Sequence, residues 1–127
     1  MKTRIAFFLL VALSFCPSVD CANPLDVSLV QLIAHPKDYH DKVIRVVGFV
    51  RLAFEDNAIY LHQDDYTHGI ALNGLWLDIT DEIYMKKSEF DQKYVLLAGT
   101  FHAKEKGHMG LWNGSIQKIS RFQVWSQ

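Results

Sequence analysis

The chain has 127 residues, of which 50% are hydrophobic and 21% are charged, and its formal net charge is −1. This length fits a single domain, and the half-apolar composition supports a packed core and argues against disorder. A nearly neutral chain has no general attraction for phosphate backbones, which argues against nucleic acid as a partner.

Residues 1–21 have the pattern of a secretory signal peptide. A basic start precedes the apolar run 5–15, which suits a signal but is too short for a stable membrane span. Val19 and Cys21 occupy the −3 and −1 positions of a cleavage before Ala22, and cuts after residue 18 or 22 are alternatives. We therefore expect an exported protein, periplasmic or secreted, with one domain over residues 22–127. An uncleaved N-terminal anchor is the alternative.

Both cysteines, Cys16 and Cys21, lie in this leader. The domain that follows can therefore have no disulfide, no cysteine zinc site and no cysteine nucleophile. Asp20 is an unfavourable neighbour for lipid attachment, so we do not expect a lipoprotein anchor at Cys21. Removing the leader deletes two of the 13 basic and one of the 14 acidic residues, which leaves a net charge of −2.

The first predicted element is a helix over residues 28–34. Ser28 and Gln31 form a capping-box pattern, and an apolar stripe follows on one side. Pro36 is expected to end this helix, because it disfavours helical geometry at His35.

The clearest strand is residues 43–54, where apolar or small residues alternate with polar ones. Positions 44, 46, 48, 50, 52 and 54 are expected to face the core, with Arg45 and Arg51 on the opposite face. Gly48 predicts a bend in this long strand.

Two shorter strands are expected at 58–62 and 75–79, with a polar loop over 64–74 between them. Their alternation points Ile59, Leu75 and Leu77 inward. A short helix within 80–91, with Ile83 and Phe90 buried, should lead to a fourth strand at 94–103. After a glycine-containing turn at 107–110, the last strand lies within 114–125. A bulge would reconcile its apolar spacing, with a turn of helix as the alternative.

Five strands with a helix between the third and fourth match the plan of an OB-fold. We therefore predict a mainly β domain: a five-stranded OB-like barrel with an N-terminal helix. A split sandwich and a ferredoxin-like layer are the alternatives.

Eight short segments carry a resemblance to a known group of proteins: Val27-Ser28-Leu29, His35-Pro36, Asp41-Lys42, Ile59-Tyr60-Leu61, Asp64-Asp65-Tyr66, Asn73-Gly74-Leu75-Trp76-Leu77, Gly107-His108-Met109-Gly110 and Gly114-Ser115-Ile116. Through these segments the chain resembles a group of small exported bacterial proteins with OB-like folds. The resemblance implies a fold and a compartment but no activity and no catalytic residues.

The candidate ligand surface is the outward face of the second and third strands, the usual binding platform of OB-folds. Aromatic rings stack on bases or pack on sugars, although the same face could instead seat a helix. The candidate residues are Tyr60, His62, Trp76, Tyr66, Trp112, Arg45 and Arg51.

Other chemistry has weaker support. Histidine and carboxylate side chains could bind zinc without cysteine, but the spacing of His62, Asp64, His68, His102 and His108 matches no ligand motif, so no metal or cofactor is predicted. The acidic residues Asp64, Asp65, Asp78, Asp81 and Glu82 do not form a recognisable catalytic pair.

We therefore expect a binding module without catalytic residues, whose ligand is a glycan, a peptide or a cell-envelope protein. The alternatives are an envelope stress protein or toxin inhibitor, and a histidine–aspartate metal protein or enzyme.

Overall fold

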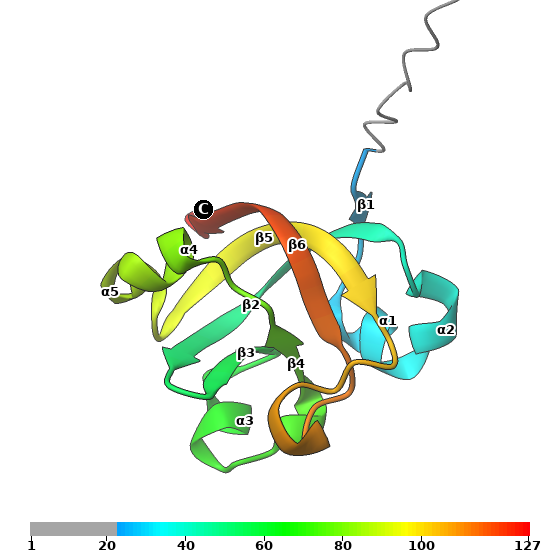
Figure 1. Cartoon of the computed structure of the whole chain (residues 1–127), viewed down its shortest axis with the longest axis horizontal. Coiled ribbons are helices and arrows are strands. Elements are labelled where there is room, and N and C mark those ends of the chain that lie inside the picture. Colours follow the sequence, from blue (N-terminus) through cyan, green and yellow to red (C-terminus); the bar gives the residue numbers. More distant parts are fainter. Residues whose placement is uncertain (1–22) are drawn as a thin grey trace, which may run out of the picture.

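The computed structural model describes residues 23–127, so the predicted leader lies outside the described residues. The described chain is mainly β, as predicted, with short helices around one six-stranded mixed sheet (Figure 1). Its strands are β1 (Leu25–Asp26), β2 (Val43–Ala53), β3 (Asp56–Tyr60), β4 (Gly74–Leu77), β5 (Lys93–His102) and β6 (Ser115–Val124).

The prediction of five strands is wrong by one. The additional strand is β1, which runs parallel to β2 and pairs Leu25 with Ile44. A two-residue strand is too short to show a period-two pattern, so the sequence offers no signal for it. The other five strands occur in the predicted order.

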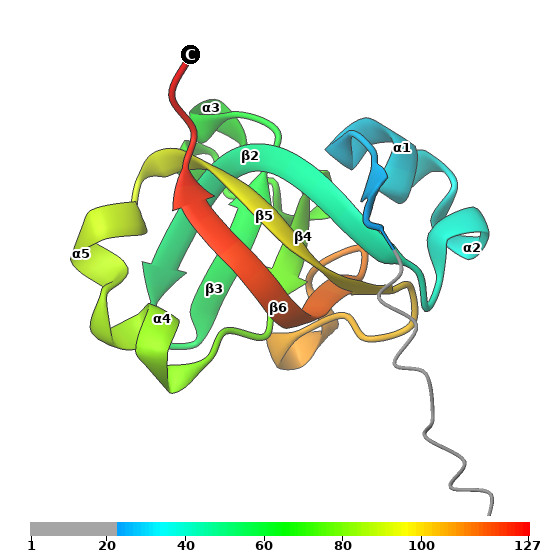
Figure 2. The ribbon, with the colours of Figure 1, turned by 90° about the horizontal axis from the view of Figure 1, so that it is seen from above.

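The strand pairings form a closed circuit. β2 pairs with β3, β3 with β4, and β4 with β6 in parallel; β6 then pairs with β5, which pairs back with β2. The long β2 serves two neighbours, because its residues 43–50 pair with β5 and its residues 49–53 pair with β3. Figure 2 shows its curved path across the molecule.

Gly48 lies in the middle of β2, where only a hydrogen fits. A Cβ atom there would lie 2.6 Å from Ile59 Cγ1 and 2.8 Å from Leu29 Cδ1. The predicted special position of Gly48 thus reflects the close approach of β2 to β3 and to the N-terminal helix.

The core consists of the inward residues of β2 to β6 together with the first helix. Ile44, Val46, Val50 and Leu52 are buried as predicted. Phe54 is 81% exposed, contrary to its predicted inward position. The reason is that β2 ends at Ala53 and the next residues turn the chain, Glu55 with a φ of 55°.

Short helices connect the strands, and Ser28 caps the first of them through the predicted capping box with Gln31. The segment predicted as a polar loop also holds helices, so that prediction is wrong in detail. Pro36 ends the first helix but starts the second. The helices are α1 (Leu29–Ala34), α2 (Pro36–Tyr39), α3 (Gln63–Thr67), η1 (Ala71–Asn73), α4 (Asp81–Met85), α5 (Lys87–Phe90) and η2 (His108–Gly110).

The predicted bulge in the last strand is confirmed. Gln117 pairs with Thr100 and Arg121 pairs with Ala98, so β6 has two more residues than β5 across this interval. Lys118 takes a φ of 48° inside it. No helix within residues 23–127 combines the length and the apolar character needed to cross a bilayer.

Candidate functional site

The predicted aromatic face is assembled by the register of β2, β3 and β4. Phe49 pairs with Tyr60, Arg51 with Ala58, and Ala58 with Trp76. Arg51, Tyr60 and Trp76 therefore share the outward side of these strands, as the alternation predicts.

This face is covered rather than open, which favours the packing alternative over the ligand surface, although a loop and not a helix covers it. Tyr60 and Trp112 are each only 4% exposed, and the indole Nε1 of Trp112 donates a hydrogen bond of 3.2 Å to the Tyr60 hydroxyl. The ring centroids of Trp112 and Trp76 lie 5.0 Å apart. The β5–β6 loop thus folds back over β3 and β4 and turns the predicted platform into a second small core.

Burial affects the chemistry of Tyr60. Desolvation raises the pKa of its hydroxyl, and the hydrogen bond from Trp112 opposes part of this rise. The neutral phenol is therefore the stable form, which suits a packing role.

Arg51 and Tyr66 lie beside this small core and are held by internal contacts. Arg51 Nη1 is 2.6 Å from Asp91 Oδ2, and its guanidinium lies 5.2 Å from the centre of the Tyr66 ring. The second Asp91 oxygen accepts a hydrogen bond from the Leu52 amide at 2.8 Å. Arg51 therefore ties β2 to the end of α5, and its charge already has a partner.

The remaining predicted ligand residues lie elsewhere. His62 is exposed at the start of α3. Arg45 forms an ion pair with Asp26, whose pKa the Arg45 hydrogen bonds lower. Arg45 lines a wide groove of about 700 Å³, which Arg121 and Trp125 also line. The seven candidate residues do not form one site.

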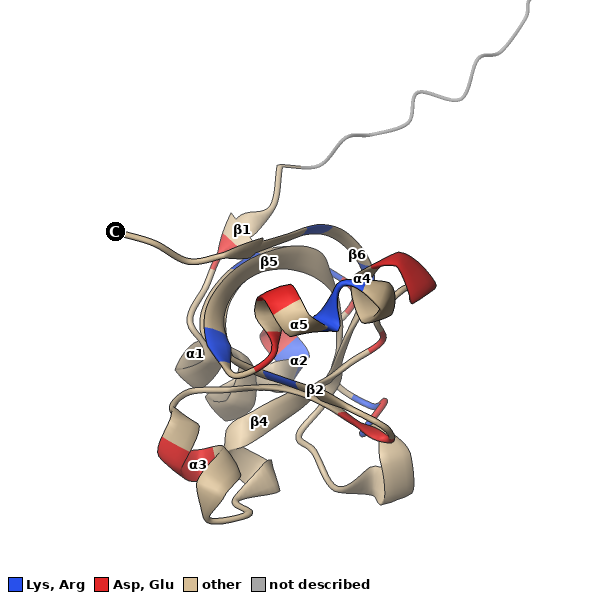
Figure 3. Cartoon of the chain, turned by 90° about the vertical axis from the view of Figure 1, so that its left-hand side faces the viewer, with Lys and Arg blue, Asp and Glu red and all other residues tan. Residues whose placement is uncertain are grey.

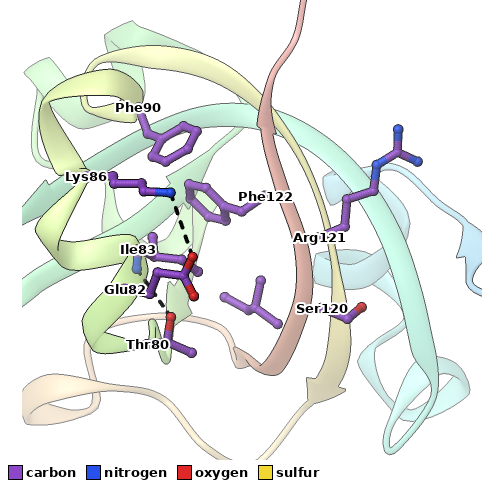
Figure 4. A pocket seen from close by; sticks show the side chains of 9 residues that line it. Thr80, Glu82, Ile83, Lys86, Phe90, Ser120, Arg121 and Phe122 are labelled. Carbon is purple, nitrogen blue, oxygen red and sulfur yellow. Dashed lines mark hydrogen bonds and ion pairs between the residues drawn. The ribbon is translucent and has the colours of Figure 1, made fainter.

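A different pocket opens between α4–α5 and β6 (Figure 4). Its volume is about 260 Å³. Phe90 and Phe122 form its apolar wall, with ring centroids 4.9 Å apart and nearly perpendicular planes. An ion pair of 3.7 Å between Lys86 and Glu82 lies at its rim. Figure 3 shows that α4 and α5 carry both signs of charge.

This pocket adjoins the free edge of β6. Four successive residues, 119–122, line the pocket. Successive side chains of a strand point to opposite faces, so four lining residues in a row indicate that the backbone edge itself faces the pocket. Figure 4 shows Phe122 directed into the pocket and Arg121 directed away from it.

The edge is free because β6 diverges from β4. Among the described residues, β4 pairs with β6 only at Ser115 and Ile116, and the last backbone link is from the Asp78 amide to the Ile116 carbonyl at 3.0 Å. Beyond this point, the side of β6 that faces away from β5 has no strand partner within residues 23–127.

The sequence predicts the burial of residues that line this pocket, but it does not predict that a pocket forms between them. Ile83 and Phe90 are partly buried as predicted, and Phe122 was expected in the last strand. The opening itself depends on where β6 separates from β4, a tertiary property with no sequence pattern.

The histidine and aspartate residues considered from sequence are not gathered into one centre. Asp65 is structural, since its carboxylate accepts hydrogen bonds from the His62 amide and from Asn73 Nδ2, at 3.2 and 2.9 Å. His108 faces Glu55 at 3.5 Å. Of the five metal candidates, His102 alone joins a potential ligand group among the described residues, with His40 and Asp41.

Comparison of the chain with protein-family models returns no match. Comparison with curated proteins returns no match either. The resemblance to small exported bacterial proteins therefore stays a prediction.

Proposed function

We propose that this protein is an exported, OB-like binding module that holds an extended peptide segment of a protein partner against the free edge of β6. The observation that carries the proposal is the unpaired β6 edge beside an apolar pocket. An unpaired strand edge presents amide and carbonyl groups that an added strand can satisfy, and a neighbouring pocket can select side chains.

The OB-like assignment is supported by the order of the strand pairings. In chain order, β2, β3, β4, β5 and β6 correspond to the five strands of an OB-fold, and α4–α5 lies between the third and fourth of them. The small strand β1 and helix α1 are additions at the N-terminal side.

A peptide at the β6 edge is better supported than a glycan on the aromatic face. Sugar binding by stacking requires an accessible ring face, whereas Trp76 lies between Trp112 and Gly107. The pocket volume of about 260 Å³ is below the usual range of roughly 300–1,000 Å³ for small-molecule sites. That volume suits one or two side chains of a longer ligand.

The test is a selection of random displayed peptides on the purified protein, followed by affinity measurements on individual synthetic peptides. We expect enriched peptides to carry an apolar residue, because Phe90, Phe122 and Ile83 line the pocket. Phe122→Ala should weaken binding at least 10-fold, and Glu82→Arg should change the charge preference of the selected peptides.

A matched control is Tyr66→Ala, which removes a partly buried ring from the aromatic face and leaves the pocket unchanged. Circular dichroism of each variant verifies folding. Failure to enrich any peptide, or equal weakening by Tyr66→Ala and Phe122→Ala, would contradict the proposed site.

Export is tested separately by expressing the full chain in a bacterium and sequencing the N-terminus of the protein from the periplasmic fraction. The proposal expects a mature chain that starts at Ala22. Retention of an intact N-terminus in the cytoplasm would contradict export without affecting the peptide site.

A further inference from the structure

A second constellation lies near the opposite end of β2, where three side chains from distant parts of the sequence meet. His40 follows α2, Asp41 precedes β2, and His102 is the last residue of β5. His40 Nε2 lies 3.4 Å from Asp41 Oδ2, and His102 Nδ1 lies 3.2 Å from Asp41 Oδ1. Each residue offers one possible ligand atom, and these three atoms all lie within 4.8 Å of one another.

The backbone holds these residues in place. The Asp41 amide donates to the Phe101 carbonyl at 2.8 Å, and the Phe101 amide donates to the Lys42 carbonyl at 3.0 Å. Asp41 adopts a φ of 61°, a left-handed conformation that aspartate tolerates better than most residues. The turn thus holds the Asp41 backbone where its carboxylate lies within 3.4 Å of both imidazole rings.

We propose that His40, Asp41 and His102 bind one Zn²⁺ ion. Zinc takes imidazole nitrogen and carboxylate oxygen at about 2.0–2.1 Å, so ligand atoms around a tetrahedral ion lie roughly 3.4 Å apart. The two carboxylate–imidazole separations run to different oxygens of Asp41, so they match this spacing for a carboxylate that binds the ion through both oxygens, one beside each imidazole. Asp41 is 65% exposed, so water can reach the ion.

The donor set determines the class of metal. Two imidazoles with one carboxylate favour zinc and similar transition metals, whereas calcium and magnesium prefer oxygen ligands alone. The zinc ion would fasten the turn before β2 to the end of β5, so its role at this place is to stabilise the fold.

One existing contact limits the affinity. His40 Nδ1 accepts a hydrogen bond from the Ala103 amide at 3.1 Å, so the ring proton of neutral His40 resides on Nε2. Coordination through Nε2 displaces that proton to Nδ1 and breaks the contact with Ala103. A ligating histidine normally donates from its second nitrogen, so we expect weaker binding than at a preorganised structural zinc site.

The test uses tag-free protein, stripped with a chelator and titrated with zinc chloride alone in a calorimeter. We expect a single ion per chain, with binding weakened at least 10-fold by His40→Ala and by His102→Ala. His108→Ala is the matched control, since it removes a histidine that faces one carboxylate only. It should leave zinc binding unchanged.

A second measurement covers the case in which a variant folds poorly. Cobalt(II) bound to the wild-type protein should give the visible absorption of a four-coordinate site with nitrogen and oxygen ligands, and zinc should displace it. Zinc should also raise the melting temperature of wild-type protein but not that of Asp41→Asn. Absence of a stoichiometric ion, or binding that persists in the double variant His40→Ala, His102→Ala, would overturn the proposal.

Discussion

At the residue scale, the glycines of the β5–β6 loop determine how closely this loop covers the aromatic face. Gly107 has a φ of 69°, and a Cβ atom there would lie 2.5 Å from Trp76 Cγ. This contact lets the β5–β6 loop lie on the indole and helps to close the aromatic face. Gly110 has a nearly identical φ of 68° but no atom within 4 Å of its would-be Cβ.

Gly107 therefore differs from Gly110 in steric contact, and its φ and ψ of 69° and −162° also lie in a region that essentially only glycine adopts. We expect Gly110→Ala to destabilise the protein by about 1 kcal/mol, the usual cost of a positive φ for alanine. Gly107→Ala should cost about 1–3 kcal/mol more, because it adds backbone strain and overpacks the loop against Trp76. Urea unfolding measures both values. Equal losses would show that the loop does not press on Trp76.

Asp56 is a second informative residue, located where β3 begins. Partial burial raises the pKa of its carboxyl; Arg51 opposes the rise and the nearby Asp91 adds to it. The folded state therefore holds the proton more tightly than the unfolded state. The contribution of Asp56 to stability must therefore fall as the pH rises above about 4, the ordinary range for aspartate, and level off above the raised pKa.

Asp56→Asn should remove this pH dependence. We expect the variant to be at least as stable as wild type at pH 7 and to lose that advantage on acidification towards pH 4. Thermal unfolding at a series of pH values gives the comparison. A variant that is less stable than wild type at pH 7 would mean that the Asp56 carboxylate has a favourable role in the fold.

Individual residues also show how far sequence reasoning reaches. Alternation correctly placed Leu52, Ile59 and Leu77 in the core. It failed for Phe54, since the strand ended one position earlier. It gave the correct side for Tyr60, which faces outward but lies under Trp112. Alternation tells which side of a strand a residue is on and not whether a distant loop covers that side.

At the element scale, a local signal correctly predicted the start of α1. The Ser28 hydroxyl accepts from the Gln31 amide at 3.2 Å, and the Gln31 side chain accepts from the Ser28 amide at 2.9 Å. This box fixes a six-residue helix whose Leu29 and Leu32 fill the core. Ser28→Ala should therefore lower stability by about 1 kcal/mol.

The control for this prediction is Ser88→Ala, at an exposed position inside α5. A surface change of this kind is expected to stay within about 0.5 kcal/mol. Chemical denaturation of both variants measures their losses of stability relative to wild type. Comparable losses would mean that the capping box contributes little beyond the packing of the two leucines.

Elements without local signals were missed. β1 is too short for periodicity, and α3 and η1 occupy a polar stretch that reads as a loop. Asp65 makes α3 possible by capping its start and by binding Asn73, which lies in η1. Such side-chain contacts become visible only when the two segments are brought together in three dimensions.

At the scale of the whole molecule, one circuit of strand pairings accounts for both the core and the open edge. β2 pairs on both sides, with β3 and with β5, whereas β6 leaves β4 after two residues. α4 and α5 lie across the gap that results, and the pocket separates them from β6 (Figure 1). The proposed peptide site is a direct consequence of this incomplete pairing.

The most direct test of this account is amide hydrogen exchange of residues 118–124, measured without and with a peptide selected on the protein. The account predicts that edge amides of β6 exchange readily in the free protein and become protected when the peptide binds, because an added strand satisfies them. Protection that appears instead around Tyr66 and Trp76, with β6 unchanged, would contradict the assignment of the binding site.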